Sequence, residues 1–480
     1  MKPKIEKQIS ELFKEWSGEE ILQISQLPRS GSDREYIRIK GKTKSVIGTY
    51  NPDKKENNAF LNFSKHFLSE GLNVPEIYSE VPKDNIYIQE DLGNTTLFGY
   101  LSKVYVDGIF PKQLIEIYKR ILTELPRFQI EGSKNLDFSV CYPRSSFDKQ
   151  SMMWDLNYFK YYFLKLAKVH FDEQELENDF QTFTDYLLKA DRDYFLYRDF
   201  QSRNIMLNDD KVYFIDYQGG RRGALQYDVA SLLYDSKADI PQHIREELLD
   251  TYVDAVGKYI KIDREEFINY FQGYTLVRIM QAMGSYGFRG FYEKKEHFLL
   301  SIPFALKNLK YQLENLRLPI KLPALINALE QVLESDFLKQ FGKNKNPLKV
   351  TISSFSYKKG FPADVSGNGG GFVFDCRCLN NPGRYPEFKK VTGKDQPVID
   401  FFSEQTDIHE YLKRVYSIVD MAIENYSERK FGNLMINFGC TGGQHRSVFC
   451  AENLNEYLKK KYGIETDLRH TENHLFTDNK

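Results

Sequence analysis

Long apolar runs are missing from this chain of 480 residues. No segment approaches the roughly 18 consecutive apolar residues of a membrane-spanning helix. The N-terminal stretch 1–17 is charged and amphipathic, and it lacks the apolar centre of a signal peptide. We therefore expect a soluble, cytoplasmic protein with no membrane partner.

Cysteine is also scarce. The five cysteines are an odd number without the spacing of a disulfide framework, which indicates free thiols in a reducing compartment. Cys376 and Cys378 are separated by one residue, and no second pair repeats that spacing, so a zinc site is not favoured.

An excess of either charge is the third absence. The chain has 66 basic and 67 acidic residues, a net charge of −1, and so no overall attraction to nucleic acid or to an anionic membrane. Hydrophobic residues make up 41% and charged residues 28%, which are values of globular proteins. The length predicts two or three domains.

The first two-thirds of the chain changes character near residue 91. Short strand-like segments at 21–26, 36–39, 45–50 and 86–90 accompany helical patterns at 1–17 and about 56–70. Helical spacing then dominates, at 112–129, 154–169, 172–189, 224–236, 241–259 and 264–283. We predict an α+β domain over 1–337, with a small β-rich lobe (about 1–91) and a helical large lobe (about 92–337).

One segment of the large lobe departs from helical spacing. Two short strands are expected within 194–218, around a turn at Asn208-Asp-Asp. A hairpin that carries polar residues inside a helical lobe is a candidate place for chemistry.

A polar stretch at 338–348, which ends in Asn-Pro, is the predicted linker. Strands at 349–355, 372–377 and 434–438 then alternate with helices at 405–427 and 446–462. This order predicts a separate α/β domain over 349–480 with a parallel or mixed sheet.

Three polar residues in the hairpin have the spacing of a phosphoryl-transfer centre. Asp199 and Asn204 are five positions apart, and Asp216 ends the strand twelve positions later. One carboxylate would accept the proton of an attacking hydroxyl, while an amide oxygen and the second carboxylate would hold Mg²⁺. The alternative is that the three residues only cap turns and strands.

Residues 1–335 resemble the aminoglycoside phosphotransferase family, and within it the anomeric kinases of N-acetylmuramate and N-acetylglucosamine. The likeness is carried by Arg198-Asp-Phe-Gln-Ser-Arg-Asn-Ile-Met206, Ile215-Asp-Tyr-Gln218 and Gln226-Tyr-Asp-Val-Ala-Ser-Leu-Leu-Tyr-Asp235. The resemblance implies a two-lobed, protein-kinase-like fold with ATP and Mg²⁺ as cofactors. It also implies an amino-sugar substrate, Asp199 as base, Asn204 and Asp216 as metal ligands, and Asp228 as a brace of the catalytic loop.

The nucleotide contacts depart from the usual kinase pattern. The strand 45–50 has Gly48 and Thr49 where most kinases have a lysine, so Glu56 in the next helix lacks an evident partner. Phosphate contacts are expected from a loop that could equally be a plain turn, with the residues Ser30, Gly31, Ser32 and Arg34. Adenine contacts are expected from the hinge between the lobes, at Glu90 and Asp91.

The missing lysine also motivates a different function, a regulatory adapter that binds nucleotide without turnover. The acceptor residues are not evident in the sequence. Trp154 beside Asp155 could bind a sugar, although core packing is the commoner role of such residues.

The second domain contains a strand, a glycine-rich turn and a helix start at 438–447. Such a helix N-terminus attracts anions, and Arg446 could add a charged fork. Cys440 and Arg446 also have the C-x₅-R spacing of a phosphatase loop, which makes Cys440 a candidate nucleophile as an alternative.

Residues 347–480 resemble the RapZ C-terminal domain through Phe372-Val-Phe-Asp-Cys-Arg-Cys-Leu-Asn-Asn-Pro382 and Gly439-Cys-Thr-Gly-Gly-Gln-His-Arg-Ser447. The resemblance implies binding of an amino-sugar phosphate and of RNA. The expected anion site consists of Asp375, Arg377, Asn381, Cys440, Thr441, Gly442, Gly443, His445, Arg446 and Ser447. RNA binding is not favoured by charge, since 345–480 contains 19 basic and 17 acidic residues.

Overall fold

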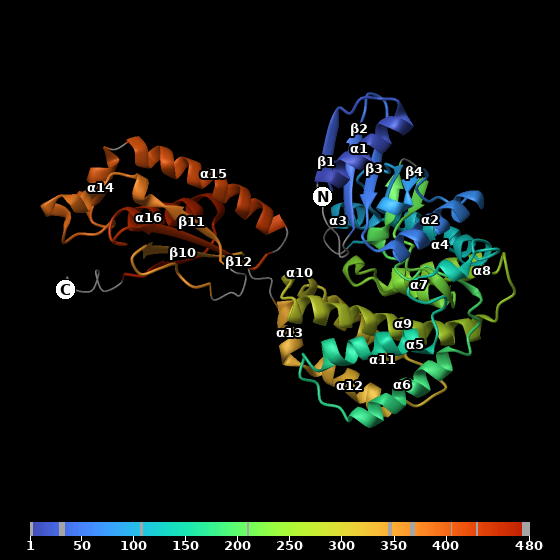
Figure 1. The fold of residues 1–480 in the computed structure, drawn as a ribbon. Coiled ribbons are helices and arrows are strands. Elements are labelled where there is room, and N and C mark those ends of the chain that lie inside the picture. The colour runs from blue at the N-terminus through green and yellow to red at the C-terminus, as the bar shows by residue number, and fades with distance from the viewer. Residues whose placement is uncertain are drawn as a thin grey trace. The chain divides into compact units, whose positions relative to one another are not determined.

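The computed structural model describes residues 3–27, 34–105, 109–208, 211–343, 348–364, 370–404, 406–428 and 431–472. The chain divides into two compact units, Met1–Gly342 and Lys343–Lys480, which are described separately (Figure 1). Among the described helices, none has both the length and the apolar composition needed to cross a membrane.

The first unit begins with a five-stranded antiparallel sheet in the order β1-β2-β3-β5-β4. Helix α1 packs on one face of the sheet through Ile9, Leu12 and Phe13. Helix α2 and the hydrophobic core to which it belongs lie on the other face (Figure 1). The elements are α1 (Pro3–Ser17), β1 (Gln23–Gln26), β2 (Glu35–Lys40), β3 (Ser45–Tyr50), α2 (Lys54–Ser69), β4 (Ile77–Val81) and β5 (Ile86–Glu90). Strand β4 was not predicted.

The two faces of this sheet explain why β3 has no lysine at Gly48. A Cβ at Gly48 would lie 2.3 Å from Cγ2 of Ile9, so the position is in contact with helix α1. Thr49 lies between Tyr36 and Tyr87 on the neighbouring strands and faces the opposite side. Because adjacent residues of a strand point to opposite faces, Thr49 and not Gly48 faces the α2 side of the sheet.

The large lobe is mainly helical. Its helices pack around one core that continues into helix α2 of the small lobe. They are α3 (Leu97–Val104), α4 (Lys112–Pro126), α5 (Lys149–Phe159), α6 (Glu173–Leu187), α7 (Gln226–Leu233), α8 (Gln242–Val256), α9 (Arg264–Tyr286), α10 (Glu296–Leu299), α11 (Ile302–Asn315), α12 (Pro323–Glu334) and α13 (Asp336–Lys343). Helix α13 includes residues 338–343 of the predicted linker 338–348, and residues 344–347 lie outside the described part of the chain.

The predicted hairpin has different partners from those expected. Strand β6 (Tyr194–Leu196) pairs with β9 (Arg221–Gly223), whereas β7 (Ile205–Asn208) pairs with β8 (Lys211–Phe214). The expectation of one hairpin over 194–218 was wrong because the polar segment 197–204 is a loop between the two pairs, not part of a strand. Two short antiparallel ladders therefore hold this loop and the segment 215–220.

Aromatic packing connects helix α2 to this region. The ring of Phe67 makes edge contacts with Phe128, Phe195 and Tyr217, at centroid distances of 5.3, 5.0 and 5.4 Å. The hydroxyl of Tyr217 lies 2.6 Å from Oγ of Ser64 on the same helix. The small lobe is thus joined to the loops that carry the polar residues.

The second unit is a four-stranded, wholly parallel sheet in the order β11-β12-β10-β13, with helices packed against it (Figure 1). Its elements are β10 (Lys349–Ser356), β11 (Phe372–Asp375), α14 (Gln396–Ser403), α15 (Thr406–Glu428), β12 (Asn433–Cys440), α16 (Arg446–Tyr462) and β13 (Thr466–His470). The predicted fold class, a kinase-like bilobal domain followed by an α/β domain, is confirmed. Strand β13 and helix α14 were not predicted.

Candidate functional site

The loop that follows β6 is held in place by one buried carboxylate. Asp228, in the first turn of α7, is 0% exposed. It accepts hydrogen bonds from the backbone N–H groups of Tyr197 (2.8 Å) and Arg198 (3.0 Å), and from Nε2 of Gln129 (3.0 Å). Burial raises the pKa of Asp228 to about 7, and the donated hydrogen bonds oppose that shift. Asp228 therefore braces the backbone directly before Asp199.

The side chain of Arg198 also stabilises this loop. Its backbone is left-handed (φ 80°), a conformation that costs energy in a residue other than glycine. Its guanidinium forms two hydrogen bonds of 2.7 Å with the carboxylate of Asp155 and a third with the hydroxyl of Tyr227. These contacts stabilise the turn that presents Asp199.

The suggested sugar-binding role of Asp155 is therefore wrong, because both of its oxygens are bonded to Arg198 and the residue is only 7% exposed. Its neighbour Trp154 is 47% exposed and lies beside the guanidinium of Arg144, 5.7 Å from the ring centroid. The exposed ring of Trp154 therefore has no free carboxylate of Asp155 beside it.

Asp199, Asn204 and Asp216 lie together. Nδ2 of Asn204 donates to the carbonyl oxygen of Asp199 (2.8 Å), and the carbonyl oxygen of Asn204 accepts from the N–H of Ile215 (3.1 Å). The backbone of Asp216 is left-handed (φ 70°), and one of its oxygens accepts from Nε2 of Gln218 (2.7 Å). Burial, and then the nearby charge of Asp199, raise the pKa of Asp216. Two carboxylates that repel one another define a place that favours a cation.

The donor set of this place suits magnesium. Because Nδ2 of Asn204 is used by the backbone, its amide oxygen is the atom left to face a ligand. Mg²⁺ prefers oxygen ligands, and a carboxylate with an amide oxygen supplies two of them. Asn204 and Asp216 could therefore hold the ion.

Glu56 has a partner that the sequence did not reveal. Nη2 of Arg34 lies 3.6 Å from Oε1 of Glu56, and the guanidinium lies 5.2 Å from the ring centroid of Phe60. Arg34 is 2% exposed, and within the described chain its Nε and Nη2 atoms have no hydrogen-bond partner. Arg34 also acts electrostatically on Asp216. The strand has no lysine for Glu56, as the sequence indicated, and a guanidinium from the segment before β2 pairs with this carboxylate instead.

The remaining predicted nucleotide contacts are only partly described. Ser30, Gly31 and Ser32 lie outside the described residues. The N–H of Glu90 donates to the carbonyl oxygen of Glu76 (2.9 Å), so that backbone group is engaged. The carboxylate of Asp91 binds Arg38 (2.8 Å) and Ser45, which tie the hinge to β2 and β3.

In the second unit, the carboxyl ends of β11 and β12 lie side by side, as the pairing of Asp375 with Gly439 shows. The loop after β12 leads into α16, which begins at Arg446. Asp375 and Arg377 are exposed and form a bidentate ion pair, and the guanidinium of Arg377 lies 3.9 Å from the ring centroid of Tyr357. Thr441 and Gly442 are exposed on the loop.

The other predicted anion residues have structural partners. Nη1 of Arg446 donates to the carbonyl oxygens of Arg377 (3.1 Å) and Leu379 (3.0 Å), so its fork does not face solvent. His445 is buried with Nε2 at 2.8 Å from the carbonyl oxygen of Phe388. Nη1 of Arg446 thus holds the loop after β11, while its Nε is a buried donor without a hydrogen-bond partner among the described residues, and its role as an anion ligand stays a prediction.

Three further residues of that prediction also lie on this edge of the sheet. The side chain of Asn381 accepts from the N–H of Gly383 (3.2 Å), and Gly443 is a buried left-handed residue (φ 69°). Ser447 is buried, with its hydroxyl 3.1 Å from the sulfur of Cys440. The accessible part of the predicted set is thus limited to the loop tip and to the pair Asp375–Arg377.

Cys440 lies in an unsuitable setting for a phosphatase nucleophile. It is 3% exposed, its sulfur contacts Ser447, and Arg446 is turned toward backbone carbonyls. We predict that Cys440→Ser leaves any hydrolysis of p-nitrophenyl phosphate unchanged, because a phosphatase needs an accessible thiolate and a free arginine fork. A loss of such hydrolysis in the variant, but not in Cys378→Ser at an exposed position, would contradict this prediction.

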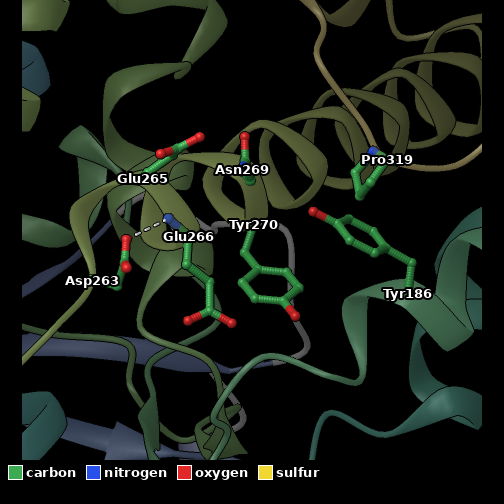
Figure 2. A pocket seen from close by; sticks show the side chains of 7 residues that line it. All are labelled: Tyr186, Asp263, Glu265, Glu266, Asn269, Tyr270 and Pro319. Atoms are coloured by element: carbon green, nitrogen blue, oxygen red, sulfur yellow. Dashed lines mark hydrogen bonds between the residues drawn. The ribbon is translucent and has the colours of Figure 1, made fainter.

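A surface pocket of about 280 Å³ lies at the start of α9, away from all predicted site residues in sequence. Figure 2 shows its lining, in which Glu266 and Tyr270 point to one side of the helix and Glu265 to the other. Asp263 caps the helix by accepting from the N–H of Glu266 (3.0 Å). The acidic residues of this pocket have a helix-capping explanation.

Several residues of the site were not singled out from the sequence. Arg198, Gln129 and Tyr227 support the loop 197–204, and Arg221 lies buried close to it. A charged residue directly before Asp199 was the only available signal for the first of them. Asp155 was singled out, but as a possible sugar contact and not as the partner of Arg198.

Comparison with known proteins agrees with both halves. A model described as phosphotransferase enzyme family matches residues 23–267, and a model of the RapZ C-terminal domain matches residues 348–474. A nucleotide-binding protein of Actinobacillus pleuropneumoniae serotype 5b is 38% identical over 129 residues, 27% of this chain and 43% of the relative. The RNase adapter protein RapZ of Yersinia enterocolitica is 32% identical over 145 residues, 30% of this chain and 48% of the relative. The chain thus spans less than half the length of these curated relatives.

Solved structures that match this chain include choline kinase LicA from Streptococcus pneumoniae, at a TM-score of 0.41 and 14% identity, covering 65% of this chain and 99% of that one. The ADP-bound aminoglycoside phosphotransferase APH(2'')-Ib has a TM-score of 0.44 and 13% identity, covering 71% and 99%. Likeness at this level does not bear on substrate.

Proposed function

Because this chain belongs to the phosphotransferase enzyme family, we propose that its first unit is an ATP- and Mg²⁺-dependent kinase of a small molecule, with an amino sugar such as N-acetylmuramate or N-acetylglucosamine as acceptor. The observation that carries the proposal is the meeting of Asp199 and Asn204, on a loop braced by Asp228, with Asp216 of the segment that follows β8. Loops held so firmly suit a reaction in which positioning and charge stabilisation supply most of the rate.

The roles of the residues follow from their contacts. Asp199 would orient an acceptor hydroxyl and take its proton as the oxygen attacks phosphorus. Asn204 and Asp216 would hold Mg²⁺, which neutralises charge on the phosphates when it is bound. Asp228 and the pair Arg198–Asp155 keep the base in place and do not touch the reacting atoms.

Arg34 would supply the cation that a strand lysine supplies in other kinases. A buried guanidinium that pairs with Glu56, acts on Asp216 and has N–H groups without a hydrogen-bond partner among the described residues is suited to a charge-assisted contact with a phosphate oxygen. Such a role for Arg34 would weaken the main motive for the alternative of an adapter without turnover, which is the missing strand lysine.

We predict that Arg34→Met lowers kcat/KM for ATP by about 10- to 10²-fold, because a charge-assisted phosphate contact is lost. Arg34→Lys should recover part of this loss, since it keeps the charge without the fork. Steady-state kinetics at varied ATP, with melting temperatures of each variant, check the prediction. Unchanged kcat/KM in a folded Arg34→Met protein would contradict it.

The second unit would bind a phosphorylated sugar at the carboxyl edge of its sheet. The N-terminal end of α16, the exposed loop residues Thr441 and Gly442, and the guanidinium of Arg377 support an anion there. Thermal-shift measurements on the full chain with glucosamine 6-phosphate and glucosamine test this, and Arg377→Gln should weaken the response to the phosphate alone. Equal shifts with both sugars would argue against an anion site.

The kinase proposal is tested by ATP consumption with a panel of N-acetylated hexoses and with Mg²⁺ present or chelated. Turnover of one or more sugars that stops on chelation is the expected result. Tight ATP binding without turnover of any sugar would reject the kinase proposal and favour the nucleotide-binding adapter.

A further inference from the structure

Arg221, at the start of β9, is a buried cation without a counter-ion. The residue is 6% exposed. Within the described part of the chain its one hydrogen bond runs from Nε to the carbonyl oxygen of Gly219 (3.1 Å), and no carboxylate there lies within 4.0 Å of it. Burial, and then the like charge of Arg198, lower the pKa of Arg221 to about 10. A buried charge in this condition is costly unless a ligand pairs with it.

The neighbouring arginines differ from Arg221 in this respect. Arg198 is neutralised by two hydrogen bonds to Asp155. Arg222, the next residue of β9, forms an exposed ion pair with Asp193 and lies over the ring of Phe138 at 4.1 Å. Only the guanidinium of Arg221, among these three, keeps its two terminal nitrogens without a partner in the described residues.

The position of Arg221 connects it to the proposed base. Gly219, which accepts from Arg221, lies against Asp199: a Cβ at Gly219 would be 3.7 Å from Oδ2 of Asp199. The groups that act most strongly on the charge of Arg221 are Arg198, Asp155, Tyr227 and Asp199, all of the large lobe.

The metal carboxylate has different neighbours. Asp216 is affected by Asp199, Arg34 and Arg203. Arg34 thus acts on the proposed metal ligand and pairs with Glu56 of the small lobe, whereas Arg221 is held at Gly219, which lies against Asp199. We take the Arg221 side of Asp199 to be the side from which an acceptor hydroxyl approaches.

We propose that Arg221 selects an acceptor that carries an anionic group, such as a carboxylate, in addition to the hydroxyl that is phosphorylated. The two free guanidinium nitrogens offer the paired donors that a carboxylate or a phosphate accepts. This inference rests on the proposed kinase function and narrows it, since a neutral hexose leaves the buried charge of Arg221 unpaired.

The experiment compares acceptors that differ in charge and little else. kcat/KM is measured for N-acetylmuramate, for its neutral methyl ester, for N-acetylglucosamine and for N-acetylglucosamine 6-phosphate. A preference of about 10- to 10²-fold for the acid over its ester is expected, as one charge-assisted hydrogen-bonded pair supplies. The phosphate-bearing sugar shows whether the anion that fits is a carboxylate or a phosphate.

The matched variants are Arg221→Gln and Arg222→Gln, which remove one positive charge from adjacent positions of the same strand. Arg221→Gln should abolish the preference for the acid through a higher KM, with little change for the ester. Arg222→Gln should keep the preference. Arg221→Lys serves as a second variant if the glutamine protein is poorly folded, and it should retain part of the preference.

Three outcomes overturn the inference. They are equal kcat/KM for acid and ester in the unmodified protein, an equal loss for both in Arg221→Gln, and turnover of neutral acceptors alone. An equal loss would mean that Arg221 contacts the transferred phosphate or supports the fold. Failure of the kinase proposal has a different signature, because no acceptor, acidic or neutral, is then phosphorylated.

Discussion

Asp199→Asn is expected to lower kcat by at least about 10²-fold, because an amide of the same shape cannot accept the proton of the attacking hydroxyl. The substitution should leave the loop in place. Asn204 bonds to the backbone carbonyl of Asp199 and not to its side chain, and Asp228 holds the preceding N–H groups. ATP binding, measured by titration calorimetry, should therefore remain close to that of the unmodified protein.

A suitable control is Asp193→Asn. Asp193 is a carboxylate six positions earlier, 74% exposed in its ion pair with Arg222 and outside the proposed chemistry. It should retain full kcat. Should Asp199→Asn keep more than a tenth of the activity, another group must take the proton and the assignment of the base fails.

Asp228→Ala is expected to reduce the free energy of unfolding of the first unit by about 3–5 kcal/mol, as removal of one partner from a buried hydrogen-bonded set does. The N–H groups of Tyr197 and Arg198 and the amide of Gln129 would lose their acceptor at a position that is 0% exposed. The measurement is urea denaturation followed by tyrosine or tryptophan fluorescence. Because the chain has two units, the unfolding transition of the first must be resolved from that of the second.

Asp228→Asn keeps the size and shape of the side chain but removes one of its two hydrogen-bond acceptors. One of its side-chain atoms becomes a donor and must oppose an N–H of the loop, so an intermediate loss of stability is expected together with reduced kcat. Asp235→Asn is a useful comparison, since Asp235 lies beyond the same helix and accepts from Ser202. A loss in Asp228→Ala no larger than in that variant would show that the brace has little importance.

Much of the fold follows from local patterns. The helix predicted over 446–462 has the bounds of α16, and the alternation of strands and helices after residue 349 led to the parallel sheet. Strand β13 was missed because its sequence, Thr466-Asp-Leu-Arg-His470, is polar and lies at a sheet edge. Strand β4 was missed for a related reason: none of its five residues is fully buried, so it lacks the alternation that predicts a strand.

The sequence by itself predicted the phosphoryl-transfer centre that we propose for the first unit. Asp199, Asn204 and Asp216 lie within 18 positions of the sequence, with strands around them. A motif of this short range can be recognised from one sequence without knowing how the chain packs. It likewise determined the two fold classes, because hydrophobic periodicity reports which face of each element is buried.

Only the tertiary structure decided which charges meet. Arg34 and Glu56 are separated by 22 positions, and Arg198 and Asp155 by 43, and both pairs form because packing of the sheet, α2 and α5 brings the residues together. Nη1 of Arg446 binds two backbone carbonyls, a contact that the sequence did not indicate, and Arg221, which was not singled out, has no carboxylate partner among the described residues. Periodicity tells which face a side chain lies on. It does not tell what lies opposite, and that is settled by contacts between distant parts of the chain.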